Sequence, residues 1–308
     1  MKQINKYKKL GLATLVGALF VSCGLALFWP NGQQEWLIIS QIRLPRMLAA
    51  LLVGSMVAIS SWLVQIVFQE KMIDAANLGL MDGPYFLVLL SIVIVPDLAN
   101  DRVIIGAVAG GLMMFVISHL QNIHQLYGRS LILSGLATAI FFLAMTHIIA
   151  SGDGMRGVTL GSVTWLDIIF LLGILTLSGL VLSSYYPKLR FLALPEVQLQ
   201  QLPLAVDRIR WQSLLIAGVL AGSAASVLGS VLFVGVMMQF MLGMLWHRPM
   251  YRRLGLSVLL GMTIFNVGDI LSPHMLGSRQ LPSADVIQLT AVGVLLVMRG
   301  IIYAKRRI

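Results

Sequence analysis

The sequence predicts an all-α, polytopic membrane bundle with about ten transmembrane helices and cytoplasmic N and C termini. Hydrophobic residues make up 58% of the 308 residues and charged residues only 11%, whereas soluble domains carry roughly a quarter charged residues. Several apolar runs reach about 18 residues or more, enough to cross a hydrocarbon core roughly 30 Å thick. Lys and Arg gather in alternate connections between these runs.

The spans are expected in the following order. The first covers about 10–29 after a basic start, and the second about 47–68 after Arg46. Spans at about 79–95, 103–121, 130–150 and 164–185 follow, and the last two lie at about 254–271 and 284–303. The apolar segment 211–246 is too long for one ordinary span and suits two, with a turn near Gly229-Ser230.

The charge pattern supports this count. With the N terminus inside and the spans alternating, 17 of the 22 Lys and Arg residues face the cytoplasm. This bias agrees with the positive-inside rule. If 211–246 crossed only once, Arg248, Arg252, Arg253 and the basic C-terminal tail would lie outside. The pattern therefore favours two spans in that segment and a multi-pass protein of the bacterial cytoplasmic membrane.

The chain is expected to form a single transmembrane domain over residues 1–308. Its longest polar stretch, about 186–210, is too short to fold independently. The net charge of +10 is explained by cytoplasmic loops beside membrane lipid, so no nucleic-acid partner is expected. Cys23 is the single cysteine and lies in an apolar run that continues beyond it, which favours a retained first span over a cleaved signal.

Small residues mark one helix face in the seventh span. Gly218, Gly222 and Ser226 are spaced four apart, and such a face lets two helix backbones approach closely in lipid. We therefore expect this face to pack against another helix.

The sequence argues against an enzyme. It contains no G-x-x-x-x-G-K-[ST] phosphate loop, and the dipeptide Gly-Lys does not occur, so P-loop binding of ATP by this chain is excluded. The five histidines are scattered and no H-E-x-x-H motif is present. Neither a catalytic metal nor a cofactor is expected.

Few charged residues fall inside the apolar spans. Asp82 is expected near the cytoplasmic start of the third span, and Asp269 near the outer end of the ninth. No chain of intramembrane acids is evident, which counts against a proton-driven secondary carrier. Sodium coupling through backbone carbonyls stays open.

Methionines gather in the eighth span. Methionine is flexible and polarizable, so this group suits either core packing or the lining of a path for a bulky, partly apolar ligand. The candidates for such a lining are Met237, Met238 and Met241, with Met244 nearby.

Two polar segments are candidate contact surfaces. Arg43 and Arg46 lie just outside the second span, which Pro45 begins; they suit either lipid headgroups or an acidic external partner. Within 186–210, Pro195 and Pro203 bracket a short amphipathic stretch, which suits either a plain connection or the contact surface of a cytoplasmic partner.

These motifs resemble a known permease family, the membrane subunit of type II ABC importers for iron-siderophores, heme and cobalamin. Arg43-Leu44-Pro45-Arg46, continuing Leu48 to Gly54, is similar to that family's second helix. The similar stretches further along the chain are Leu131–Gly135, Glu196–Pro203 with Asp207-Arg208, Gly229–Gly235, Arg252–Gly261 and Gln280-Leu281-Pro282. The resemblance covers nearly the whole chain.

The resemblance implies an ATP-driven importer of an iron complex. Two permease chains, identical or paralogous, would form the pathway, and two cytoplasmic ABC ATPase subunits would supply ATP hydrolysis. An external substrate-binding protein would dock through Arg43 and Arg46. The ATPase contact would be made by Glu196, Val197, Gln198, Leu199, Gln200, Leu202 and Pro203, and the cytoplasmic gate would lie at Tyr127, Gly128 and Arg129.

The sequence also departs from the family pattern. Glu70–Ala75 stands where the family has Asn-Pro-Leu-Ala-Asp-Pro, and Met238-Gln239-Phe240 replaces Val-Pro-His. The chain is thus a divergent member, and heme, siderophore and cobalamin stay open as substrates. A standalone secondary carrier and a membrane scaffold without transport are the alternatives outside the family.

Overall fold

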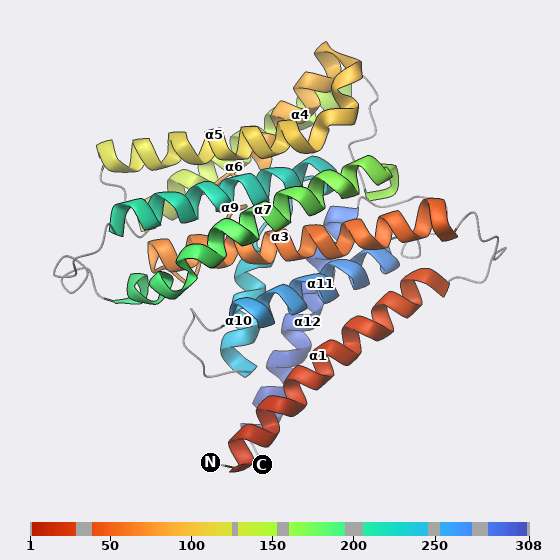
Figure 1. Ribbon diagram of the computed structural model, residues 1–308, viewed down its shortest axis with the longest axis vertical. Coiled ribbons are helices and arrows are strands. Elements are labelled where there is room, and N and C mark those ends of the chain that lie inside the picture. The colour runs from red at the N-terminus through yellow and green to blue at the C-terminus, as the bar shows by residue number, and fades with distance from the viewer. Residues whose placement is uncertain are drawn as a thin grey trace.

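The computed structural model describes residues 2–28, 39–124, 129–152, 160–194, 206–245, 253–272 and 283–306 (Figure 1). Within these ranges the regular structure is entirely helical, as predicted. Ten α-helices are present there: α1 (Lys2–Phe28), α3 (Leu44–Phe68), α4 (Asp82–Ile94), α5 (Arg102–His124), α6 (Arg129–Gly152), α7 (Trp165–Leu189), α9 (Val206–Leu228), α10 (Val234–Leu245), α11 (Leu254–Leu271) and α12 (Ser283–Arg306). Four short helical segments accompany them: η1 (Ile39–Arg43), η2 (Pro96–Asp101), η3 (Leu160–Ser162) and η4 (Arg190–Ala193).

The helix order confirms the predicted spans. The segment 211–246 contains two helices, α9 and α10, separated at Gly229 and Ser230, and α11 has the predicted bounds. The expected polar stretch 186–210 is shorter than predicted, because α7 continues to Leu189 and α9 begins at Val206. Pro187 lies inside α7 and does not end it.

Contacts between helix ends establish the directions of the helices. Arg46 near the start of α3 binds Asp269 near the end of α11, whereas Arg102 and Asp167 join the starts of α5 and α7. Gln69, just after α3, binds Leu192 of η4. Helices α3, α5 and α7 therefore run in one direction, from what we call the Arg46 end to the Gln69 end of the bundle.

The remaining long helices of the bundle interior run the opposite way. Gly106 of α5 lies against Gly222 of α9, and Gly110 lies against Gly218, so α9 is antiparallel to α5. Helix α11 is antiparallel to α3, because Arg46 near the start of α3 binds Asp269 near the end of α11. Figure 1 shows α3, α5, α7 and α9 as a stack of nearly aligned helices, with α1, α11 and α12 beside it. The start of α1 and the end of α12 lie close together at the lower edge of the picture.

The closest helix packing involves the small residues that the sequence singled out. A Cβ atom on Gly222 would collide with the backbone carbonyl oxygen of Gly106, and one on Gly218 with that of Gly110. The predicted small-residue face of α9 is thus confirmed as a packing face, and its partner is α5. A second pair, Gly54 of α3 and Gly261 of α11, brings those two backbones together in the same manner.

The outer surface of the bundle is apolar. Large side chains on α5, α6 and α7 are more than half exposed, among them Leu112, Phe115, Leu133, Phe141, Ile169 and Leu180. A soluble protein rarely exposes such continuous apolar surface, whereas lipid tails accept it. Six described helical segments are long and apolar enough to cross a membrane, and four shorter apolar helices accompany them.

Two of the short helices, α4 and α10, begin inside the bundle. Gly83 at the start of α4 lies against Met113, near the middle of α5. Gly235 at the start of α10 lies against Ser61, one and a half to two turns before the end of α3. Non-helical backbone at this depth is tolerated where protein surrounds it. Residues 73–81 before α4 are buried, and so are Gly229 and Val231 before α10.

Candidate functional site

A bidentate ion pair ties α3 to α11 at the Arg46 end. The Arg46 guanidinium donates to both oxygens of Asp269, with Nε–Oδ2 at 2.7 Å and Nη2–Oδ1 at 2.9 Å. The Arg46 side chain is 27% exposed and that of Asp269 is 8% exposed. Arg46 therefore binds Asp269, which lies 223 residues away in the sequence, and part of its side chain stays exposed.

Arg43 lies at the same end of the bundle. It ends η1, and its Nη1 donates to the carbonyl oxygen of Leu27 in the last turn of α1 at 3.0 Å. A cation beside the final carbonyl groups of a helix is favourable, because the partial charge there is negative. The predicted pair of arginines is thus brought together, and each also stabilises the fold.

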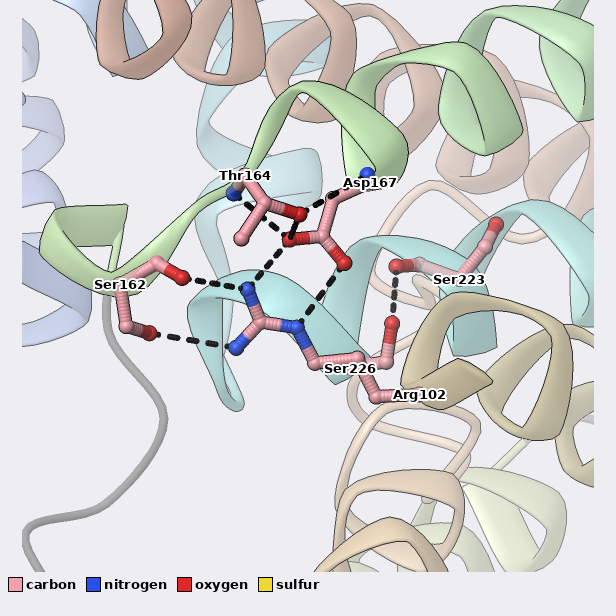
Figure 2. Close-up of polar contacts among 6 residues, drawn as sticks. All are labelled: Arg102, Ser162, Thr164, Asp167, Ser223 and Ser226. Atoms are coloured by element: carbon pink, nitrogen blue, oxygen red, sulfur yellow. Dashed lines mark hydrogen bonds and ion pairs between the residues drawn. The ribbon is translucent and has the colours of Figure 1, made fainter. Parts of the chain in front are cut away.

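A second ion pair at this end is more deeply buried (Figure 2). Arg102 Nη2 donates to Asp167 Oδ2 at 2.6 Å and Arg102 Nε to Oδ1 at 3.1 Å, and the two side chains are only 8% and 2% exposed. The remaining guanidinium nitrogen donates to the hydroxyl of Ser162. Thr164 caps α7: its hydroxyl accepts from the Asp167 N–H, while its own N–H donates to Asp167 Oδ2 at 2.8 Å.

Polar side chains also meet inside the bundle, where α4 and α10 begin. Asp74, 1% exposed, accepts the Asn77 N–H at 2.8 Å through Oδ1 and the Val236 N–H at 3.3 Å through Oδ2. Val236 is in the first turn of α10, so this carboxylate lies at a helix N terminus, where negative charge is stabilised. The side chain of Asp74 and that of Ser61 both contact Gly235.

Asp82 lies deeper than the sequence suggested. We expected it near the cytoplasmic start of a span, but its neighbour Gly83 contacts Met113 midway along α5. The expectation was wrong because the connection after α3 does not stay at the surface: residues 73–83 are buried and turn back into the bundle. Two acids, Asp74 and Asp82, are therefore buried in the bundle interior, where we expected no such group.

The Gln69 end holds the start of the predicted coupling segment. Gln69 Nε2 donates to the carbonyl oxygens of Leu192 and Leu194, both at 2.8 Å. Gln69 has a φ of 55°, a left-handed conformation that redirects the chain at the end of α3. The predicted ATPase contact Glu196–Pro203 lies outside the described residues, and Gln69 fixes the position from which that segment departs.

The other predicted site residues are placed as follows. Tyr127 and Gly128 lie outside the described residues, and Arg129 is the first residue of α6. Met238 and Met241 are fully buried in the core, and Met237 is partly buried against it. Within one chain these three methionines pack, and their part in a pathway stays a prediction.

Comparison with known proteins decides the family. The model of the FecCD transport family matches residues 9–299. This chain belongs to the FecCD transport family.

Individual relatives agree with the assignment. The chain is 26% identical over 255 residues to the "Probable heme-iron transport system permease protein IsdF" of Staphylococcus aureus strain Newman, covering 82% of this chain and 78% of that one. Relatives in this family are permease subunits, so the FecCD-family chain is a multi-pass protein of the cytoplasmic membrane and not an enzyme.

Solved structures share the fold. A metal-chelate type ABC transporter in an inward-facing conformation matches with a TM-score of 0.76 at 21% identity, over 93% of this chain and 97% of that chain. PsaBC from Streptococcus pneumoniae, in complex with Fab, matches with a TM-score of 0.59 at 15% identity, over 83% and 90%. The predicted permease fold is thereby confirmed.

Several residues of these sites gave little signal in the sequence. Asp269, the partner of Arg46, is far away along the chain. Asp74 lies in a stretch whose sequence is typical of an ordinary polar loop. Asp167 had one readable signal, its place three residues after Thr164 at the start of an apolar run, which is the spacing of a capping box.

Proposed function

We propose that this FecCD-family chain is the permease subunit of an ATP-driven importer for an iron complex, heme or an iron-siderophore. The observation that carries the proposal is the family match over residues 9–299, together with the likeness to a relative named as a heme-iron permease. Cobalamin is the second substrate class, because the sequence resemblance includes it.

The proposal assigns the energy source to another chain. The sequence contains no phosphate loop, so ATP hydrolysis belongs to cytoplasmic ABC ATPase subunits bound at Glu196–Pro203. Gln69 supports this assignment, since its two hydrogen bonds hold Leu192 and Leu194 directly before that stretch. A second permease, identical or paralogous, would complete the pathway, with gates at Tyr127, Gly128 and Arg129.

Reconstitution tests the function directly. The chain is placed in proteoliposomes with its ATPase subunits and presented with a binding protein loaded with heme, a ferric siderophore or cobalamin. We expect uptake of heme or the siderophore that requires ATP and ceases when the ATPase is omitted. Uptake by the chain alone without ATP would identify a secondary carrier. Uptake of cobalamin, without uptake of heme or the siderophore, would identify cobalamin as the substrate.

Charge reversal distinguishes a docking role of Arg43 and Arg46 from a role in stabilising the fold. Arg43→Glu is expected to weaken docking of the binding protein by about tenfold in Kd, the loss of roughly one charge-assisted contact. Thermal stability should fall as well, because the hydrogen bond to the Leu27 carbonyl is lost and an anion is placed at the end of α1. Arg46→Asp is expected to lower both docking and stability, because it places a second carboxylate beside Asp269.

A swap variant provides the control. Arg46→Asp combined with Asp269→Arg restores an opposite-charge pair between α3 and α11, so the Tm should recover while docking stays weak. Docking and Tm are measured on the same preparations, by surface-immobilised binding and by thermal unfolding in detergent. Unchanged docking in Arg43→Glu and in the swap variant would limit both arginines to a structural role.

A further inference from the structure

Two interruptions of the helical pattern meet inside the bundle. One is the connection 69–81 before α4, which is buried from residue 73 onward, and the other is the connection 229–233 between α9 and α10. Gly229 of the second connection lies against the Tyr85 ring in the first turn of α4, and Asp74 of the first connection accepts the Val236 N–H at the start of α10. Ser230 and Asp74 are accordingly neighbours of Asp82. Broken helices that meet at membrane depth are a recurring framework for ion sites.

The two acids have no basic partner in the described part of the chain. The described ion pairs are those of Arg46 with Asp269 and Arg102 with Asp167, and the groups that act on Asp74 and Asp82 include no Lys, Arg or His. Asp74 has both oxygens occupied by backbone N–H groups. Asp82 is 1% exposed, and neither of its oxygens completes a hydrogen bond of ordinary geometry among the described residues.

Other buried oxygen atoms on α3 and in the two connections are in the same condition. The hydroxyls of Ser61 and Ser230 and the side-chain oxygens of Gln65 and Asn77 are buried without a hydrogen-bond partner in the described structure. Ser61 and Gln65 are one turn apart on one face of α3, the face that contacts Gly235 and thereby Asp74. A buried polar oxygen without a partner costs about 1–3 kcal/mol, so the lone pairs of these oxygens are available to a cation.

Charge balance selects the ligand class. Two carboxylates contribute two negative charges, and the N termini of α4 and α10, both aimed at the cluster, each contribute roughly half a positive charge. About one negative charge remains. The donors are all oxygens, which exclude soft metals and suit hard cations, and the described residues include no group of three or more His, Cys, Asp or Glu suited to a transition metal.

We propose that Asp82, Ser230, Ser61 and Asn77 form a binding site for one monovalent cation, with Na⁺ as its probe, at the junction of the two broken helices. The cation would neutralise Asp82 and join the start of α4 to the connection between α9 and α10. The site is independent of the importer proposal, because it requires neither an ATPase nor a transported substrate.

Equilibrium binding of ²²Na⁺ to the purified full-length chain in detergent, in a choline buffer, tests the site. We expect saturable binding of one Na⁺ per chain, and a higher Tm in NaCl than in choline chloride at equal ionic strength. Asp82→Asn should abolish both effects. Ser230→Ala, which keeps the carboxylate, should weaken Na⁺ binding by about tenfold, the value of one hydrogen-bonding ligand.

Asp97→Asn is the matched control, because Asp97 is exposed in η2, and it should leave Na⁺ binding unchanged. If Asp82→Asn does not fold, the Ser230→Ala measurement decides alone. The proposal is overturned if the wild-type chain shows no saturable ²²Na⁺ binding, or if its Tm responds to pH and not to Na⁺, which would identify a bound proton. Binding unaffected by Ser230→Ala would also overturn it.

Discussion

Asp167→Asn is expected to destabilise the protein by about 3–5 kcal/mol, the loss found when one partner of a buried ion pair is removed. The substitution keeps the shape of the side chain, and Thr164 can still cap α7. The Arg102 guanidinium, however, would stay buried without its counter-charge, and the introduced amide NH2 cannot accept one of the two hydrogen bonds that the carboxylate accepts. Thermal unfolding in detergent measures the effect.

Two further variants separate charge from packing. Arg102→Met combined with Asp167→Leu removes both charges and should recover much of the lost stability, because a buried ion pair can often be replaced by apolar side chains of similar volume. Asp97→Asn, at an exposed position of η2, should unfold at the wild-type temperature. An Asp167→Asn protein as stable as wild type would show that the pair in Figure 2 contributes little.

Gly222→Leu is expected to prevent α5 and α9 from packing, and so to abolish or severely reduce the folded fraction. A Cβ at this position meets the carbonyl oxygen of Gly106 and the Cα of Gly110. Both obstacles are backbone atoms that cannot move aside as a side chain can, so the cost should reach or exceed the roughly 1–3 kcal/mol typical of overpacked cores. Size-exclusion chromatography and thermal unfolding report the folded, monodisperse fraction.

Gly173→Leu is the matched control for this substitution. Gly173 is also a glycine within a long apolar helix, but a Cβ there meets nothing within 4 Å. That variant should express and elute like wild type. If the two variants behave alike, the close approach of α5 and α9 is not required for folding.

Much of the fold could be predicted because span length and charge bias are local properties of the sequence. They gave α11 its bounds and required two helices between residues 211 and 246. The face formed by Gly218 and Gly222 predicted close packing, but not that α5 was the partner. The partner of a helix face depends on the arrangement of the whole bundle, which no local pattern contains.

The candidate sites were harder to predict for the same reason. Arg43 and Arg46 stood out by residue type and position, yet the ion pair with Asp269 joins residues 223 positions apart. Asp82 was placed at the membrane surface because a span of ordinary length was assumed, whereas α4 has 13 residues and starts halfway along α5. Hydropathy measures how apolar a segment is, and not the depth at which its helix begins.

Helix α3 is attached at both of its ends. Near its start, Arg46 binds the end of α11, and just beyond its last residue, Gln69 holds η4. Its 25 residues contain no interruption and span roughly 37 Å at 1.5 Å per residue. An unbroken helix of this length resists compression, so a displacement along its axis at one membrane face arrives at the other nearly undiminished. The helix therefore forms a stiff mechanical link between the two faces. Arg46 attaches one end of it to α11, and Gln69 attaches the other end to η4.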